Sequence, residues 1–589
     1  MTGLGVDFLR EKASCSDRRL QPVSWSLKAL ATAVAIVPVM LQTASQAEVL
    51  SVTGGLDTTT VGPRTYESVL VTGTAADGHP STYTASGFLT LTDPAAAMTA
   101  ADSGRVIIDG GLSAVGYGDI SGGGSLTANS AASFDAGFYA YDGGSLAIGG
   151  SGSLSTPVGQ LLYLSGITSF TRSSGGSYSV GVLSIADSAT VGFTSSDAVA
   201  GDVLVDTSST LDVAAPLSTS GTLFLANGGA VTRSSQTITA AGVTLTGAST
   251  FQSIAGDSYA SASVGGGSQF TNAAALTLST LAVSGDDGAG TSSRFTANAP
   301  LTISAGGVIQ VSNGGSLDAR SSVTGDGSAS QLTVSGTGSL LRVAAAVSGF
   351  DTITIDQGAI LDLASGDLAA NTLGLGGASF SRTAGSYHVG TLTLADSASV
   401  NYGTSDAITA NAVIGAGSRL ELFRGLSLSG GLTLSDSGSL SRNSHAITAP
   451  ALTVSGSSSL GLQAGDSIDD LTLTGGGEVT CTVALLLSSL SIVDPGSLLQ
   501  LDSFDGMNGE LHYALRLYGD RQADLSSYLT GGQISLGSAP QTPGVIYDFS
   551  SYGNFTYVGY VAAVPEPSTL ILLLGSLVAG IPLFRRHAR

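Results

Sequence analysis

The sequence of 589 residues predicts an all-β protein whose body is a right-handed parallel β-helix, or solenoid, with coils of about 20 residues. Three observations predict this fold. Glycine is abundant, with 82 residues, about double the usual share in a globular protein. Short segments of alternating apolar residues recur every 19 to 21 residues, separated by Gly, Ser, Asn and Asp. Two long segments also match each other at an offset of 209 or 210 residues.

The 20-residue recurrence is visible at the first residue of each apolar segment. These residues are Leu183, Val203, Leu223 and Val243, and later Leu392, Val413, Leu432, Leu452, Leu471 and Leu490. The strands are too short to form stable hairpins alone, but they can pair in parallel with the coils before and after. Leu, Val and Ile would then face inward and Thr and Ser outward. With a rise of about 4.8 Å per coil, about twenty coils would measure about 100 Å.

A set of β-sandwich domains is the competing fold, because hairpins also give short strands and many turns. A sandwich does not explain the 20-residue period. The solenoid region is predicted to span residues 48–504, with an internal duplication of about 169–285 and 379–493. Rare residue types align between the two copies: Arg172 with Arg382, Tyr178 with Tyr387, Asp197 with Asp406, Arg233 with Arg442, and Asp257 with Asp466.

Residues 1–47 have the order of a secretory signal peptide. Basic residues precede a short apolar stretch, Ala29 to Leu41, and small residues follow it. Ser45 and Ala47 fit the pocket of signal peptidase, so cleavage is predicted after Ala47. The apolar stretch is too short for a comfortable membrane span.

The C-terminal residues 564–589 have three parts: a Pro565-Glu566-Pro567 motif, an apolar stretch of fifteen residues at 570–584, and a basic cluster of Arg585, Arg586 and Arg589. The prolines hold the motif extended, the form in which a protease reads backbone. A helix of fifteen residues reaches only about 22 Å, short of the hydrocarbon core of about 30 Å. Transient membrane retention is therefore favoured over a permanent anchor, with the basic cluster on the cytoplasmic side.

This arrangement resembles the PEP-CTERM sorting signal. The resemblance implies processing at the motif by an exosortase, a membrane-embedded cysteine transpeptidase, in bacteria that make exopolysaccharide. It covers only the last 26 residues, and an ordinary C-terminal membrane anchor is the alternative. The predicted body resembles the solenoid passengers of autotransporters.

Residues 505–563 differ in composition from the repeats and are predicted to form an aromatic-rich β cap. Leu511 to Tyr518 alternates strictly, and tyrosines and phenylalanines follow. An open solenoid end exposes unpaired strand edges, so a covering module is expected there. A glycan-binding aromatic face is the other interpretation of this segment.

Charge and cysteine content restrict the possible partners. The net charge is −22, and the two lysines, Lys12 and Lys28, both lie in the predicted leader. Nucleic acid is therefore not an expected partner, because phosphate binding needs clustered Lys and Arg. After cleavage Cys481 would be the one cysteine, so no internal disulfide is predicted, and its alternating context predicts a buried thiol.

No catalytic constellation, cofactor motif or metal-ligand spacing stands out in the sequence. The acidic pairs Asp286-Asp287 and Asp469-Asp470 lie in or beside glycine-containing turns, where turn solvation is the expected role. Asp502, Asp505, Asn508 and Glu510 form an acidic loop, but their spacing departs from known calcium loops. The four histidines that would remain after both processing steps, His79, His388, His445 and His512, are expected to be surface polar residues.

The sequence therefore predicts an exported, non-enzymatic protein of the cell surface or extracellular matrix of a Gram-negative-type bacterium, with a structural or adhesive role. Its expected partners are signal peptidase, an exosortase-type transpeptidase and exopolysaccharide. A carbohydrate-active β-helix lyase or hydrolase is one alternative, which requires a cleft lined by acidic residues from neighbouring coils. Ice binding is another, and it requires pairs such as Thr237-Ile238-Thr239 to stack in register.

Overall fold

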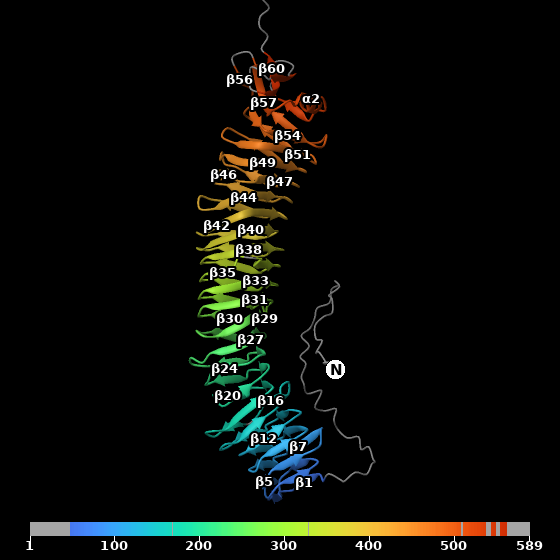
Figure 1. Ribbon diagram of the computed structural model, residues 1–589, viewed down its shortest axis with the longest axis vertical. Helices are drawn as coiled ribbons and strands as arrows, with labels where there is room; N and C mark the ends of the chain where they lie inside the picture. The colour runs from blue at the N-terminus through green and yellow to red at the C-terminus, as the bar shows by residue number, and fades with distance from the viewer. Residues whose placement is uncertain are drawn as a thin grey trace, which may run out of the picture. The chain divides into compact units, whose positions relative to one another are not determined.

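The computed structural model describes residues 48–167, 169–327, 329–507, 511–537, 544–548 and 554–561. All of them belong to the second of the two compact units into which the chain divides, residues 1–47 and 48–589. The ribbon of the second unit is shown in Figure 1.

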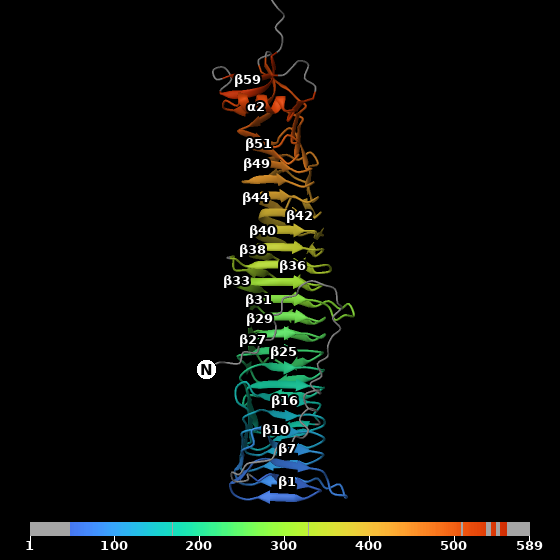
Figure 2. The ribbon, with the colours of Figure 1, turned by 90° about the vertical axis from the view of Figure 1, so that its right-hand side faces the viewer.

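Between residues 50 and 501 the chain is a parallel β-solenoid of about 22 coils. The predicted fold and its coil length of about 20 residues are confirmed, while its right-handedness stays a prediction. Every ladder between described strands in this range is parallel, which excludes sandwiches built from hairpins. Figure 2 shows the strands of successive coils stacked as rungs.

One sheet, the main sheet, runs through all the coils and contains 25 strands. Its strands in chain order are β1 (Leu50–Thr53), β4 (Val69–Thr72), β7 (Ala96–Ala101), β10 (Tyr117–Ile120), β13 (Phe138–Ala140), β16 (Leu161–Ser165), β19 (Val182–Ala186), β22 (Val203–Val205), β24 (Leu217–Ser218), β25 (Thr222–Leu225), β27 (Ile238–Leu245), β29 (Ser258–Gly265), β31 (Leu276–Ser284), β33 (Leu301–Ser312), β35 (Val323–Gly325), β36 (Gln331–Ser335), β38 (Val347–Asp356), β40 (Asp367–Gly376), β42 (Ser386–Ala395), β44 (Ala407–Ile414), β46 (Leu426–Ser427), β47 (Gly431–Leu434), β49 (Ile447–Ser455), β51 (Ser467–Thr474) and β54 (Ser489–Ile492).

The first coils have three strands each, so two further sheets flank the main sheet. The six-stranded sheet contains β2 (Asp57–Thr60), β5 (Thr82–Ala85), β8 (Arg105–Ile108), β11 (Ser125–Ala128), β14 (Ser145–Ile148) and β17 (Ser169–Arg172). The seven-stranded sheet contains β3 (Arg64–Tyr66), β6 (Leu89–Leu91), β9 (Leu112–Ala114), β12 (Ala131–Phe134), β15 (Ser153–Ser155), β18 (Ser177–Val180) and β21 (Ala198–Val199).

Later coils have longer main-sheet strands, since one strand continues across two sides of the coil. β33 is twelve residues long and pairs with both β35 and β36 of the next coil. The remaining side is divided into four short sheets. These contain β20 (Thr190–Phe193), β23 (Thr210–Val213) and β26 (Ala230–Thr232); β28 (Thr250–Ser253), β30 (Gln269–Asn272), β32 (Arg294–Ala297), β34 (Ser316–Ala319), β37 (Leu340–Val343), β39 (Ile360–Leu363) and β41 (Ser379–Arg382); β43 (Ser399–Tyr402), β45 (Arg419–Leu422) and β48 (Ser439–Ser441); and β50 (Ser459–Leu462), β52 (Glu478–Cys481), β55 (Leu498–Leu501) and β58 (Ile534–Leu536).

The core consists of aliphatic ladders inside the coils. Leu183, Val203, Leu223 and Val243 stand opposite one another on successive strands and are all buried. Each coil thus covers the apolar face of the one before, which supplies most of the folding free energy of such an array. The predicted inward ladder is correct here.

One predicted ladder position differs by a residue. Val413 was expected to face inward, but Ala412 stands opposite both Leu392 and Leu432, and Val413 faces outward. The register of β42 and β44 shifts between Val389 and Thr391. Because side chains alternate along a strand, that shift of one residue exchanges the inward and outward faces.

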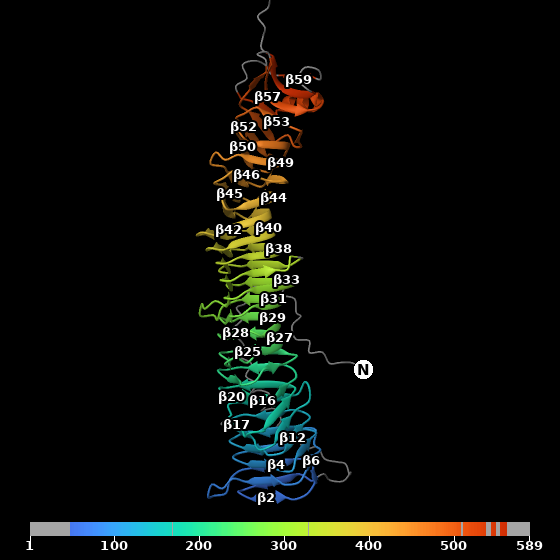
Figure 3. The same cartoon turned by 60° about the vertical axis from the view of Figure 1, so that its left-hand side comes forward.

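Beyond the last coil lies a five-stranded sheet that includes antiparallel pairs, called here the terminal sheet. It contains β53 (Leu485–Leu487), β56 (Asp505–Met507), β57 (Leu511–Tyr518), β59 (Gly544–Asp548) and β60 (Phe555–Val561). A helix that the sequence pattern did not predict, α2 (Gln522–Thr530), precedes β58 and buries Leu525. Figure 3 shows β57 and β59 beyond β52 and β53.

Candidate functional site

The residues predicted to direct export and sorting lie outside the described residues. They are Ser45, Ala47, Pro565, Glu566, Pro567, Arg585, Arg586 and Arg589, together with the apolar stretch 570–584. Within the part of the chain that is described, no helix has the length and apolarity to span a membrane.

Of the two predicted acidic pairs, Asp286 and Asp287 hold their own turn, whereas Asp469 and Asp470 lie within β51. The Asp287 carboxylate accepts hydrogen bonds from the N–H groups of Ala289 and Thr291, both at 2.9 Å, and these backbone contacts lower its pKa. Asp286 accepts from the Gly288 N–H at 2.9 Å. Asp286 and Asp287 lie in a long connection that makes this coil larger than its neighbours. Their contacts support turn stabilisation rather than acid–base chemistry.

The other single candidates also have structural surroundings. Cys481 is fully buried, and burial raises the pKa of its thiol to about 12, so the reactive thiolate is not formed at neutral pH. His388 Nε2 lies 2.7 Å from the Ser405 carbonyl oxygen. Among the described residues no group of three or more His, Cys, Asp and Glu side chains could hold a metal ion. Asn508 and Glu510 of the acidic loop lie outside that part of the chain.

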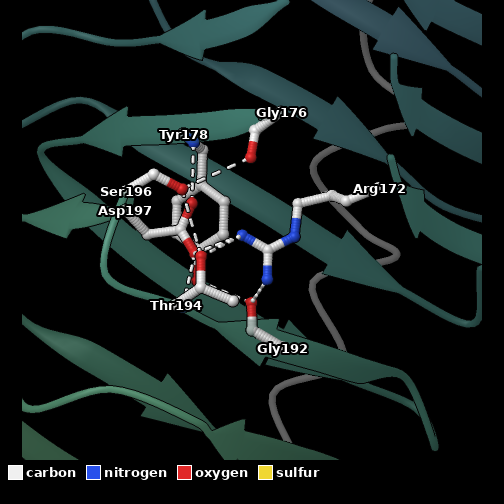
Figure 4. A network of polar contacts seen from close by, with 7 residues as sticks. All are labelled: Arg172, Gly176, Tyr178, Gly192, Thr194, Ser196 and Asp197. Atoms are coloured by element: carbon white, nitrogen blue, oxygen red, sulfur yellow. Dashed lines mark hydrogen bonds and ion pairs between the residues drawn. The ribbon is translucent and has the colours of Figure 1, made fainter. Parts of the chain in front are cut away.

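The arginines and aspartates that align between the duplicated segments form buried pairs between successive coils. Figure 4 shows the first, in which Arg172 is paired with Asp197. The Asp197 carboxylate also accepts the N–H groups of Tyr178 at 3.0 Å and Thr194 at 2.7 Å. Arg172 in turn donates to the Gly192 carbonyl oxygen at 2.9 Å.

Among the residues that the structure describes, the same arrangement occurs four times, and we call it the inter-coil ion pair. The four pairs are Arg172–Asp197, Arg233–Asp257, Arg382–Asp406 and Arg442–Asp466. Each arginine stands at or next to the last strand of a sheet, and these last strands are β17, β26, β41 and β48. Its guanidinium donates to a carbonyl oxygen of the next coil. The guanidinium therefore replaces ladder hydrogen bonds that the backbone does not make at these breaks.

Asp257 is the most completely bound of these carboxylates. It accepts two hydrogen bonds from Arg233, two from the backbone N–H groups of Ile238 and Ile254, and one from the Tyr259 hydroxyl at 2.5 Å. Burial alone would raise the pKa of this carboxyl, but the donors hold the pKa below its ordinary value. With its lone pairs occupied, it has no capacity left for a ligand.

A second cluster, on the outside of the main sheet, has different properties. We call Tyr117, Asp119, Tyr139, Tyr141 and Tyr163 the tyrosine strip. Asp119 stands opposite Tyr139, which stands opposite Tyr163, so the strip crosses β10, β13 and β16. All five side chains are partly exposed. The ring centroids are 5.8 Å apart for Tyr117 and Tyr139 and 6.4 Å apart for Tyr139 and Tyr163.

The local sequence explains why the tyrosines face outward. Gly118 faces the core, and its missing side chain leaves space for the rings of Phe134 and Phe138, which pack at 5.1 Å. A Cβ atom on Gly118 would lie 2.6 Å from the Phe138 ring. With Phe138 fixed inward, the alternation of the strand places Tyr139 outward.

Asp119 is the one carboxylate of the strip and is incompletely bound. The Tyr141 hydroxyl donates to its Oδ2 at 3.1 Å, while Oδ1 is buried and has no hydrogen-bond partner among the described residues. Burial raises the pKa of Asp119, and the side-chain hydrogen bonds from Tyr141 and Ser121 offset this only in part. Burial and the nearby Asp119 charge also raise the pKa of Tyr141 to about 12. A partly exposed carboxylate with acceptor capacity left at Oδ2, set among aromatic rings, is suited to binding hydroxyl donors.

Sequence reasoning missed the strip. The sequence indicates an aromatic cluster only in the terminal region, where the rings of Tyr518 and Phe555 meet edge to face with centroids 5.5 Å apart. These two rings border a cavity of about 410 Å³ whose polar wall includes Asp466 and Asp469. Asp466 is already paired with Arg442, so the cavity lacks a free acidic pair.

Further along the main sheet, the outward column that holds Asp119, Tyr139 and Tyr163 becomes rich in threonine. We call its later part the threonine column, and it consists of Thr333, Thr354, Gly374, Thr393, Val413, Thr433, Thr453 and Thr472. The threonines are aligned from coil to coil, which the sequence pattern did not predict. Gly374 and Val413 interrupt the column.

Neither a protein-family model nor a curated protein matches this chain.

Proposed function

We propose that the chain is an exported, non-enzymatic adhesive protein of the bacterial surface or exopolysaccharide matrix. The observation that carries this proposal is the tyrosine strip, a row of partly exposed rings on a repeated β framework. Aromatic rings offer large contact areas at low cost in conformational entropy and are enriched where proteins meet their partners. The stack of coils holds the rings at fixed separations, which favours contact with a polymer.

The contacts of the carboxylates support a non-enzymatic role. A glycosidase needs two carboxyl groups on either side of the bond to be cleaved. The carboxylates of the inter-coil ion pairs, Asp197, Asp257, Asp406 and Asp466, are each bound by an arginine. The lyase or hydrolase alternative therefore has less support than adhesion.

The route to the surface is part of the same proposal and rests on the sequence motifs. Signal peptidase would cut after Ala47, and an exosortase-type enzyme would process the chain at Pro565-Glu566-Pro567. Residues 570–584 would hold the chain transiently in the inner membrane, with the final basic cluster on the cytoplasmic side. The acidic mature chain would then remain at the surface through its contact with polysaccharide.

Ice binding is a second candidate, and the threonine column is the observation that favours it. Methyl and hydroxyl groups are presented in register at Thr333, Thr354 and Thr393. Gly374 and Val413 break the regularity that an ice lattice would need. A measurement of thermal hysteresis distinguishes the two candidates, because an adhesive protein should show none.

The adhesive function is tested by expressing the chain in a host that makes exopolysaccharide and measuring the fraction retained on washed cells. The variant Tyr117→Ala/Tyr139→Ala/Tyr163→Ala is compared with the matched control Thr354→Ala/Thr393→Ala/Thr433→Ala, which changes three outward residues of the same sheet. We expect wild type and control to be retained and the tyrosine variant to be released into the medium. Equal retention of all three proteins would overturn the role of the strip.

Mass spectrometry of the retained protein tests the processing steps. The expected N-terminus is Glu48, and the expected C-terminus lies within the 564–569 region. A surface-located form that still ends at Arg589 would contradict removal of the tail.

A further inference from the structure

The spacing of the tyrosine strip indicates what kind of molecule it fits. Tyr117, Tyr139 and Tyr163 come from three successive coils, with neighbouring ring centroids 5.8 and 6.4 Å apart. These separations are close to the length of one sugar unit in an extended polysaccharide. The planes of neighbouring rings are inclined at 88° and 54°, so a bound chain would meet rings of changing orientation and not one flat platform.

The charge around the strip excludes acidic ligands. The sequence has no lysine, arginine or histidine from residue 106 to residue 171. Asp93 and Asp119 lie close enough to raise the pKa of Tyr117, after the larger effect of burial, and Asp142 acts on Tyr141 in the same direction. Uronic acid or sulfated chains would meet repulsion here with no cation to offset it.

Asp119 supplies the polar contact that orients such a ligand. Its buried Oδ1 atom accepts no hydrogen bond from the described residues, and an unsatisfied buried acceptor is costly. Oδ1 is closed to a ligand because it is buried, so a sugar hydroxyl would donate to Oδ2, which has a second acceptor site beside the bond from Tyr141 at 3.1 Å. Tyr141 fixes the orientation of the carboxylate.

From these three features we infer that the tyrosine strip binds an uncharged polysaccharide, which runs across β10, β13 and β16 with its hydroxyl groups on Asp119. This inference rests on the proposed adhesive function and names its ligand class. The bound chain would cross the strands and not follow them, because Asp119, Tyr139 and Tyr163 stand opposite one another on neighbouring strands and Tyr117 lies diagonally beside Tyr139.

Affinity electrophoresis tests the inference with the full chain. Native gels contain either an uncharged polysaccharide (hydroxyethyl cellulose, dextran or galactomannan) or an anionic one (alginate or polygalacturonate). We expect retardation by at least one uncharged polymer and by neither anionic polymer. Retardation by alginate equal to that by the uncharged polymers would overturn the inference, as would no retardation by any uncharged polymer.

Variants then test the residues. Tyr139→Ala is expected to lower the affinity about tenfold or more, and Tyr139→Phe, which keeps the ring, to change it much less. Asp119→Asn should weaken binding several-fold, while Thr354→Ala on the same sheet should leave it unchanged. Melting curves followed by circular dichroism check that each variant is folded. Full affinity in folded Tyr139→Ala would refute the strip as the binding site.

The adhesive function and the ligand class can be contradicted separately. If the native exopolysaccharide retains the protein but the uncharged polymers do not, the adhesive function stands and the ligand class is wrong. If neither the native matrix nor any purified polymer binds, both are wrong.

Discussion

Asp119 in the tyrosine strip and Asp257 in an inter-coil ion pair are both carboxylates between neighbouring coils, yet their surroundings are opposite. Asp257 accepts five hydrogen bonds and its pKa is lowered, whereas Asp119 has a buried oxygen without a partner among the described residues and its pKa is raised. The difference separates two uses of one residue type. The saturated Asp257 carboxylate holds neighbouring coils together, whereas Asp119 lies in the strip for which we propose ligand binding.

The largest effect is expected from breaking an ion pair. Asp257→Asn would leave Arg233 buried without its charge partner, since the exposed fractions of the two side chains are 6% and 1%. Loss of one partner from a buried pair costs about 3 to 5 kcal/mol, and urea unfolding should show a decrease of that size. The double variant Arg233→Met/Asp257→Leu should recover part of it, because no buried charge is left. An Asp257→Asn protein as stable as wild type would show that the pair is not structural.

Acid sensitivity should distinguish the same two carboxylates. Because the pKa of Asp257 is lower in the folded state, its contribution to stability is present above about pH 4 and is lost as the pH falls through the folded value. The raised pKa of Asp119 has the opposite effect on stability. Above the pKa of the folded state, its charge lowers the stability of the protein, and protonation at lower pH removes that cost. As the pH is lowered from 7 to 3, the free energy of unfolding should therefore decrease less steeply for Asp257→Asn than for wild type. A parallel pH profile for the variant would contradict this assignment.

The framework under the strip can be disturbed without touching an outward residue. Gly118→Ala would place a Cβ atom 2.6 Å from the Phe138 ring, and overpacking of this kind costs about 1 to 3 kcal/mol. The matched control is Gly374→Ala in the same sheet, where a Cβ atom would meet nothing within 4 Å. Thermal melts should show a lower melting temperature for Gly118→Ala and little change, or a small increase, for Gly374→Ala. Equal effects would mean that the Phe134–Phe138 packing does not position the strip.

The smallest expected effect is a gain in stability, from the variant Asp119→Asn. Asp119→Asn removes a partly buried charge from an aromatic setting, so the free energy of unfolding at neutral pH should rise by about 0.5 to 1 kcal/mol while glycan affinity falls. Chemical unfolding and affinity electrophoresis on the same preparation measure both quantities. A loss of stability would place Asp119 with the structural carboxylates and remove the contrast with Asp257.

The solenoid could be predicted because its core repeats. Leu183, Val203 and Leu223 are twenty residues apart, and an aliphatic residue at each interval can only be buried by stacking. The rare Arg and Asp residues that align between the two copies indicate that both copies keep the same interaction. The structure shows that this interaction is an ion pair at a break between sheets.

The tyrosine strip could not be predicted in the same way, because Tyr117, Tyr139 and Tyr163 are separated by 22 and 24 residues and so depart from the period. Tyr117 lies two positions before Asp119, the residue in register with Tyr139, and a longer connection separates Tyr139 from Tyr163 without changing their register in the sheet. Which side chains stand opposite each other therefore depends on loop lengths that leave no hydrophobic signal. The prediction that Val413 faces inward is wrong for a related reason, because the register between β42 and β44 shifts by one residue.

Hydroxyl-radical footprinting read by mass spectrometry tests the ligand surface most directly. With an uncharged polysaccharide bound, the oxidation of Tyr139 and its neighbours in the strip should decrease, while Tyr518 of the terminal sheet, which is 56% exposed, should react as in the free protein. Protection of Tyr518 with an unchanged strip would contradict the account and place polysaccharide binding on the terminal sheet instead.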